Sequence, residues 1–104
     1  MKRRRRPHYP LKRIKAALAD PARMNRTMSA AAGAEALGMD EHAVVDVIAR
    51  LEVRDFHKSM RSELDPSLWQ DVYRPFVEGS ELYVKFTLDM QGQLLLLSFK
   101  ENLP

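Results

Sequence analysis

The sequence predicts an α+β fold in which N-terminal helices pack on one face of a C-terminal antiparallel sheet. Apolar residues recur at helical spacing up to residue 51, and from residue 55 onward they alternate with polar ones. Short connections rich in turn residues join the alternating runs. A chain of 104 residues is enough for one core. We therefore expect a single domain over residues 1–104, in which residues 1–7 form a basic, flexible arm.

The first predicted helix spans Leu11–Ala19, where Leu11, Ile14 and Leu18 recur on one side and lysines and arginines face elsewhere. Asp20 and Pro21 end it. Signals over residues 22–34 are mixed, so we expect a loop there, although Ser29 is a possible cap.

A short helix is expected around residues 34–37, and Gly38 should end it in a left-handed conformation. Asp40 then has the position of an N-cap for the clearest helix of the chain. The apolar stripe of that helix consists of Val44, Val47, Ile48 and Leu51.

Four alternating runs predict strands, and the short connections between the later runs predict antiparallel hairpins. Turn residues separate them at Asp65–Pro66, Glu78–Ser80 and Gln91–Gly92. The predicted strands are Asp55–Met60, Leu68–Phe76, Leu82–Leu88 and Leu94–Lys100.

Alternation assigns the side chains of each strand to two faces. Trp69 and Tyr73 are expected in the core, together with Leu82, Val84, Phe86, Leu88, Leu95, Leu97 and Phe99. Phe56 would be an unusual apolar residue on the opposite, open face. The expected members of that open face are Lys58, Met60, Gln70, Arg74, Tyr83, Lys85, Thr87, Ser98 and Lys100.

The net charge of +3 is divided unevenly along the chain. Residues 1–28 hold ten Lys or Arg and one acid and thus carry +9, whereas residues 29–104 carry −6. A basic block usually binds a polyanion, most often nucleic acid, although a solvated, disordered tail has the same composition. The longest apolar run, Leu94–Leu97, is too short for a signal peptide or a membrane span. We expect a soluble, cytoplasmic protein that does not bind membranes.

Cysteine is absent, which excludes disulfides, thiolate metal sites and a Cys nucleophile. His8, His42 and His57 are far apart in sequence, and none has metal-ligand spacing, so we expect neither a metal nor a cofactor. His42 is expected at the surface. His57 points away from Lys58 under strict alternation, but a bulge would turn it outward, where it would join the proton chemistry.

The open face suits the cleavage of RNA through its own 2′-hydroxyl. That reaction needs a base for the hydroxyl, a proton donor for the leaving 5′-oxygen and positive charge for the phosphorane. Lys58, Arg74, Lys85 and Lys100 offer charge, and burial beside other cations would let a lysine act as acid or base. Tyr83 is a proton donor or a stacking group, and Gln70 is a neutral hydrogen-bonding partner. An ordinary solvated sheet face explains the same residues without any chemistry.

Four segments carry a family resemblance: Phe56–Met60, Trp69–Pro75, Leu82–Lys85 and Ser98–Glu101. With Pro7–His8 and Glu35–Gly38, they closely resemble the motility quorum-sensing regulator (MqsR) family of bacterial type II toxins. His57 departs from the Tyr of that family's pattern.

The resemblance implies a RelE-like ribonuclease toxin fold and a ribosome-independent, metal-independent endoribonuclease that cuts mRNA at GCU-type sites. It implies a cognate antitoxin with a zinc-binding N-terminal part and a helix-turn-helix C-terminal part. By the same resemblance, Lys58, Gln70, Tyr83 and Lys100 are catalytic. Met60 and Arg74 line the site, and His8, His57 and Lys85 are further candidates for RNA binding.

Two other functions remain open on the sequence. A non-enzymatic RNA- or DNA-binding module would use the arginine-rich arm and the sheet to hold phosphates without cutting them. A protein-interaction module would bind only its antitoxin partner.

Overall fold

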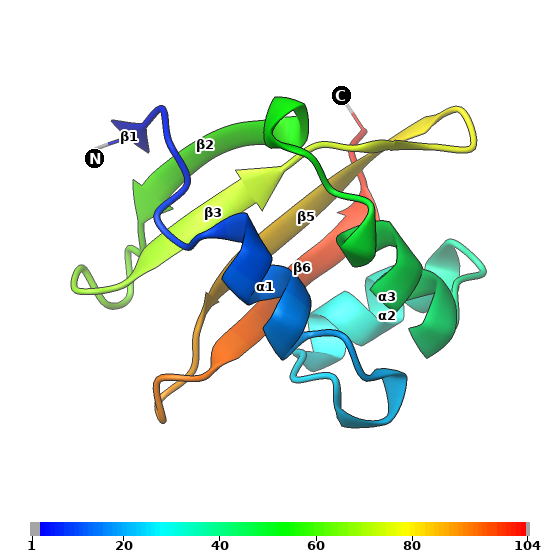
Figure 1. The fold of residues 1–104 in the computed structure, drawn as a ribbon, viewed down its shortest axis with the longest axis horizontal. Coiled ribbons are helices and arrows are strands. Elements are labelled where there is room, and N and C mark those ends of the chain that lie inside the picture. The colour runs from blue at the N-terminus through cyan, green and yellow to red at the C-terminus, as the bar shows by residue number, and fades with distance from the viewer. Residues whose placement is uncertain (1–2, 104) are drawn as a thin grey trace.

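The structure is a computed structural model that describes residues 3–103. Its three helices lie on one side of an antiparallel sheet, as the sequence predicts for an α+β fold (Figure 1). The helices are α1 (Leu11–Ala17), α2 (Met28–Ala36) and α3 (Glu41–Ala49), with 3₁₀ turns at Pro21–Arg23 and Val53–Asp55. The strands are β1 (Arg3–Arg4), β2 (Phe56–Arg61), β3 (Trp69–Tyr73), β4 (Phe76–Val77), β5 (Ser80–Leu88) and β6 (Leu94–Glu101).

The strands lie in the order β1-β2-β3-β5-β6, and every neighbouring pair is antiparallel. The short strand β4 continues the direction of β3 and pairs with the first residues of β5. Gly79 and Gly92 have positive φ angles of 85° and 77° in the turns before β5 and β6. Because glycine adopts this conformation without strain, these two turns can be tight, and the last strands form a meander.

The stretch predicted to be a flexible arm contains strand β1. Arg3 and Arg4 pair with Met60 and Ser59 of β2. Residues 1 and 2 of the arm lie outside the described residues. Farther along, the buried carboxylate of Asp71 accepts hydrogen bonds from the backbone N–H groups of His8 and Tyr9, at 3.1 and 2.8 Å. The chain is therefore held to the sheet at both positions before α1 begins.

The core lies between the helices and the sheet. The predicted stripe of α3 is buried, and so are Ile14 and Leu18 at and just after α1. Tyr73 of β3 is fully buried, and Trp69 is partly buried against the same cluster, so both are core residues as predicted. Among the described residues, no helix is long and apolar enough to cross a lipid bilayer.

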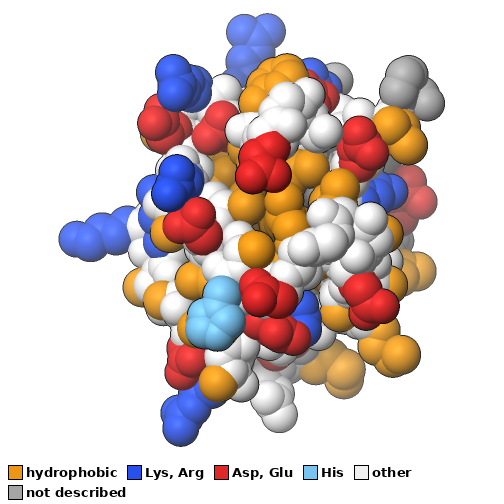
Figure 2. All heavy atoms as spheres, turned by 90° about the vertical axis from the view of Figure 1, so that its right-hand side faces the viewer, with side chains coloured by type: hydrophobic (Ala, Val, Ile, Leu, Met, Phe, Trp, Pro, Cys, Tyr) orange, Lys and Arg blue, Asp and Glu red, His pale blue; other side chains and the backbone are white. Residues whose placement is uncertain are grey.

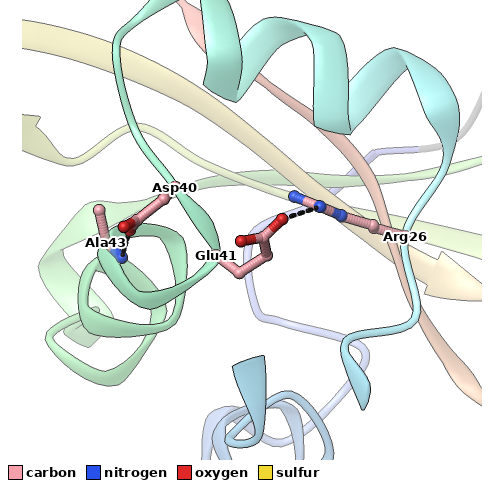
Figure 3. Close-up of polar contacts among 4 residues, drawn as sticks. All are labelled: Arg26, Asp40, Glu41 and Ala43. Atoms are coloured by element: carbon pink, nitrogen blue, oxygen red, sulfur yellow. Dashed lines mark hydrogen bonds and ion pairs between the residues drawn. The ribbon is translucent and has the colours of Figure 1, made fainter. Parts of the chain in front are cut away.

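Helix α3 begins where the sequence predicts, with Asp40 as its N-cap. The Asp40 carboxylate accepts a hydrogen bond of 2.9 Å from the backbone N–H of Ala43 (Figure 3). The next residue, Glu41, forms an ion pair of 3.0 Å with Arg26, which precedes α2. Gly38 has a φ angle of 73° between α2 and α3, as predicted for a helix stop. These contacts fix the start of α3 relative to the segment before α2.

Helix α2 is longer than predicted, because the expected loop over residues 22–34 ends at Thr27. The Thr27 hydroxyl caps the helix by accepting from the backbone N–H of Ala30 and itself donates to the Leu97 carbonyl of β6. A Cβ atom on Gly33 would lie 1.9 Å from the Phe99 carbonyl oxygen. Glycine at this position therefore lets the helix backbone lie directly on the strand. By helix propensity alone, Gly33 weakens the helix. In the folded protein its missing side chain allows α2 to contact β6.

The face assignment of β6 is wrong for two leucines. Leu94 and Leu96 are buried in the core, whereas Leu95 and Leu97 point to the open face and line a groove there. The cause is an irregularity in the pairing with β5: Lys85 is opposite Ser98, but Phe86 is opposite Leu96. The extra residue is a β-bulge, which shifts the alternation by one position. Phe99, beyond the bulge, is buried as predicted.

Acidic side chains are scattered over one face of the molecule. Figure 2 shows the side that lies to the right in Figure 1, next to α2 and α3, where Asp and Glu side chains are spread around exposed hydrophobic atoms. Lys and Arg are found mainly at the margin of this face. This side is less suited to a polyanion than the open sheet face, since its carboxylates repel phosphate groups.

Candidate functional site

Lys58, Val72, Lys85 and Ser98 form one cross-strand row over β2, β3, β5 and β6. Residues directly opposite each other in an antiparallel sheet point to the same face. The row therefore places Lys58 and Lys85 on the face that the helices leave open. Successive strands are about 4.8 Å apart. The two lysines, separated by one strand, are thus within reach of a single phosphodiester.

The neighbouring row joins Tyr83 of β5 to Lys100 of β6. The Lys100 Nζ atom lies 5.5 Å from the centre of the Tyr83 ring, and the Lys85 Nζ atom lies 5.8 Å from it. Tyr83 is half-buried, and this burial raises the pKa of its hydroxyl. The phenol is therefore held in its protonated, hydrogen-donating form, beside two ammonium groups.

We call the three lysines of these rows, Lys58, Lys85 and Lys100, the lysine cluster. Burial lowers the pKa of Lys85, and the charges of Lys100 and Lys58 lower it further. Lys100 is exposed, whereas Lys58 and Lys85 are half-buried. Among the described residues, no carboxylate lies within ion-pairing distance of the cluster. The cluster is thus an unneutralised cationic patch in the acidic part of the chain.

Gln70 lies beside the lysine cluster, because it is opposite Met60 of β2, two residues beyond Lys58. Gln70 also forms part of a groove with a volume of about 590 Å³ at this end of the open face. Apolar side chains make most of its walls, and Leu64 and Met90 at the rim are almost fully exposed. The other apolar lining residues are Leu68, Leu88, Leu95 and Leu97.

Arg74 and His57 lie at the opposite end of the open face. The pairing of β2 with β3 is irregular between Phe56 and Lys58, so His57 lies in a β-bulge. The sequence alone left open whether such a bulge forms. The His57 Nε2 atom is 3.5 Å from the Nη1 atom of Arg74, and the Arg74 Nε atom is 3.4 Å from Glu81. The bulge also turns Phe56 to the core, where it contacts Tyr73 edge-on, so its predicted place on the open face is wrong.

His8 does not join the other candidate residues. Its ring stacks on Trp69 at a centroid distance of 5.5 Å, and its backbone is held by Asp71. Trp69 and Asp71 point to the helix side of the sheet, since Asp71 is opposite the core residue Phe86. His8 therefore lies on the side away from the lysine cluster.

The structure brings eight of the nine predicted site residues to the open face: Lys58, Met60, Gln70, Arg74, Tyr83, Lys85, Lys100 and the bulged His57. Within residues 3–103, no three His, Asp or Glu side chains gather as a possible metal site. Ammonium, guanidinium, phenol and amide groups share the open face. Such a set can bind a phosphate, stabilise added negative charge and transfer protons.

Sequence reasoning missed Glu81 and the apolar groove. Glu81 accepts a hydrogen bond from Asn102 in addition to its contact with Arg74, so it fixes the direction of the guanidinium. Glu81 lies two residues before Tyr83 on β5, so alternation of side chains along the strand could have predicted that it faces the open side. The groove had no comparable signal, because it depends on the β6 bulge.

Comparison with known proteins adds two findings. The model of a family described as "motility quorum-sensing regulator, toxin of MqsA" matches residues 6–101. A protein of Escherichia coli (strain K12) named mRNA interferase toxin MqsR is 38% identical over 99 residues, which cover 95% of this chain and 98% of that protein. The matched region includes all three helices and every residue of the lysine cluster.

Proposed function

Because the chain belongs to the motility quorum-sensing regulator family of toxins, we propose that it is the toxin of a type II toxin-antitoxin system and cleaves mRNA as an endoribonuclease. The observation that carries the proposal is the convergence of the lysine cluster, Tyr83 and Gln70 on one open sheet face. The enzyme acts in the cytoplasm on RNA that is not held by a ribosome.

In the proposed reaction the 2′-oxygen of the substrate attacks the neighbouring phosphorus, so the protein needs no nucleophile of its own. Lys58 and Lys100 bind the phosphate and stabilise the negative charge of the phosphorane. Gln70 positions the 2′-hydroxyl by neutral hydrogen bonds, and Tyr83 donates a proton to the leaving 5′-oxygen. The products are a 2′,3′-cyclic phosphate and a 5′-hydroxyl, and no metal ion is required.

The two ends of the open face suit the nucleotides that flank the cleaved bond. Arg74 offers a planar fork for a neighbouring phosphate, next to His57 and the exposed ring of Phe76. The apolar groove beside Gln70, together with Met60, offers walls for an unpaired base. Proteins that read single-stranded RNA splay its bases out of the stack and hold them against their own side chains. The preferred sites are of the GCU type, as in the family that the sequence resembles.

The protein partner is a cognate antitoxin that neutralises the toxin. The family description names the toxin by its antitoxin, which supports this assignment. We propose that the antitoxin has a zinc-binding N-terminal part and a helix-turn-helix C-terminal part that binds DNA. The zinc ion of the system would then belong to the partner.

Incubation of the purified protein with unstructured RNA in EDTA tests the proposal. We expect fragments that end in 2′,3′-cyclic phosphate and begin with a 5′-hydroxyl. Lys100→Ala should abolish cleavage and leave the fold intact, because Lys100 is exposed and contributes little to the core. Lys12→Ala, an exposed lysine of α1 on the helix side, is the control and should cleave like the unaltered protein.

Two results contradict the proposal. Cleavage that requires an added divalent metal would point to a different mechanism. RNA that is retained in a salt-dependent manner without any change in length would identify a non-enzymatic binding module instead.

A further inference from the structure

The lysines of the lysine cluster are not equivalent in position. Lys85 lies on β5, which has a neighbouring strand on each side, and it stands between Lys58 of β2 and Lys100 of β6. Its direct cross-strand neighbours, Val72 and Ser98, carry no charge. Lys85 is therefore the central cation of the three.

The surroundings of Lys85 disfavour its protonated form more than an exposed surface would. The side chain is half-buried, which removes part of the water that stabilises an ammonium ion. The charged groups that act on it are Lys100 and Lys58, both cationic, and its polar neighbours Tyr83 and Ser98 are neutral. These effects lower the pKa of Lys85, with burial the largest cause. A lysine that releases its proton more readily is a better base near neutral pH.

We propose that Lys85 is the general base that removes the proton from the 2′-hydroxyl, while Lys58 and Lys100 remain charged and hold the phosphate. The inference rests on the proposed endoribonuclease function and adds a residue to its catalytic set. The other two lysines have a double role in it, because they bind the phosphate and also keep Lys85 poised to lose its proton.

The proposed step is balanced in atoms and electrons. The lone pair of Lys85 Nζ takes the 2′-hydroxyl proton as the 2′-oxygen forms its bond to phosphorus. The bond between phosphorus and the 5′-oxygen then breaks, and that oxygen takes the proton of Tyr83, whose hydroxyl burial has kept protonated. The ammonium of Lys85 afterwards returns a proton to the phenolate through solvent. Neither an oxidant nor a reductant takes part.

Lys85→Arg is the decisive variant, because arginine keeps the positive charge but does not lose its proton. Single-turnover cleavage of a short RNA should be measured between pH 6 and 10. For the unaltered protein, the rate should rise with pH and level off below the ordinary lysine pKa of about 10.4. Lys85→Arg should lose about 100-fold or more in rate. It should still bind a 2′-deoxy version of the oligonucleotide, which cannot be cut.

Chemical rescue separates a base from a residue that only maintains the structure. Lys85→Ala should regain cleavage when a small primary amine is added, in proportion to the concentration of the neutral amine. Lys100→Ala should not be rescued with this dependence. If Lys85→Arg is unfolded by circular dichroism, the rescue of Lys85→Ala remains the test.

These experiments distinguish a failure of the Lys85 proposal from a failure of the proposed ribonuclease function. An unaltered protein that cleaves, together with a Lys85→Arg variant that cleaves within threefold of it, overturns the role of Lys85 and leaves the ribonuclease function standing. The role of Lys85 is also overturned if amine fails to rescue Lys85→Ala while that variant stays folded. An unaltered protein without cleavage overturns both proposals.

Discussion

The three ammonium groups of the lysine cluster are chemically identical but differ in what surrounds them. Lys100 is exposed, while Lys85 is half-buried between two cations. Burying a charge and placing it beside like charges both cost free energy of folding. The position of Lys85 therefore suits its proposed role as a base at some expense of stability, a trade-off that is common in active sites.

Replacement of Lys85 by Met tests this cost. Because the pKa of Lys85 is lowered in the folded state, the unfolded chain binds its proton more tightly, and the charged lysine destabilises the fold at pH values below that lowered pKa. Lys85→Met should raise the melting temperature at pH 7 by a few degrees at most. The gain should shrink as the pH rises through the lowered pKa toward 10.4. Calorimetry at several pH values measures both effects.

Lys12→Met provides the control for that measurement, because Lys12 is exposed on α1. Its effect on the melting temperature at pH 7 should be small, because an exposed side chain contributes little to the core. A Lys85→Met protein that melts below the unaltered one at pH 7 would show that the ammonium contributes favourable contacts, contrary to this account.

Alternation along the strands predicted that the polar site residues share the open face, although it misplaced Phe56, Leu95 and Leu97. It placed Lys58, Gln70, Tyr83, Lys85 and Lys100 together, because side-chain direction in a regular strand depends on position alone. It left His57 undecided, since a bulge depends on how two strands pair and not on the residue itself. The role of Asp71 in holding the chain at His8 and Tyr9 was likewise hidden, because it joins groups more than 60 residues apart in sequence.

At the scale of elements, α2 and β6 form the closest contact between the helices and the sheet. The segment before α2 covers the outer edge of β6, since Thr27 N–H donates to the Leu96 carbonyl and the Leu96 N–H donates to the Asn25 carbonyl. This protects a strand edge that would otherwise be exposed. It also fixes the strand that carries Lys100.

Gly33→Ala should disrupt this contact. The added Cβ atom would lie 1.9 Å from the Phe99 carbonyl oxygen and 3.3 Å from the Cβ atom of Lys100, so α2 or β6 has to move. Overpacking of this kind typically costs about 1–3 kcal/mol. That cost exceeds the gain of up to about 1 kcal/mol that alanine normally brings over glycine inside a helix. Urea unfolding followed by circular dichroism measures the net change.

Ala32→Gly is the matched control, because Ala32 is the exposed neighbour in the same helix. It should cost about 1 kcal/mol from helix propensity alone. A stabilised Gly33→Ala protein would mean that α2 can withdraw from β6 at no cost. The packing of Gly33 against the Phe99 carbonyl would then not restrict the size of the side chain at this position.

Local signals predicted the N-cap of α3 and the glycine stop after α2, but not the β6 bulge or the start of α2, which is capped by Thr27 and not by Ser29. Asp40 and Gly38 act through their own backbone neighbourhoods, so sequence was enough. The start of α2 depends in addition on the contact of Thr27 with Leu97, and Leu97 in turn is displaced by the bulge. Both features depend on contacts between elements that are distant in sequence, so the sequence of one element alone does not predict them.

At the scale of the whole molecule, charge is separated between faces. Acidic side chains are spread over the face next to α2 and α3 (Figure 2), whereas the lysine cluster and Arg74 lie on the open side of the sheet. A polyanion is attracted to the cationic side and repelled from the acidic one. This separation of charge favours the open sheet face over the acidic face as the side that meets RNA.

This separation predicts how RNA binding depends on salt. For a single strand, the logarithm of affinity falls with the logarithm of salt concentration with a slope of about −0.7 for each phosphate neutralised. If Lys58, Lys100 and Arg74 each make one phosphate contact with the bound strand, the slope should be about −2. Lys100→Gln should make it shallower by about 0.7. Fluorescence anisotropy with a 2′-deoxy oligonucleotide, which cannot be cleaved, measures these slopes. Lys12→Gln, on the helix side, should leave the slope unchanged, and an equal loss in that variant would place the bound strand on the helices instead of the open sheet face.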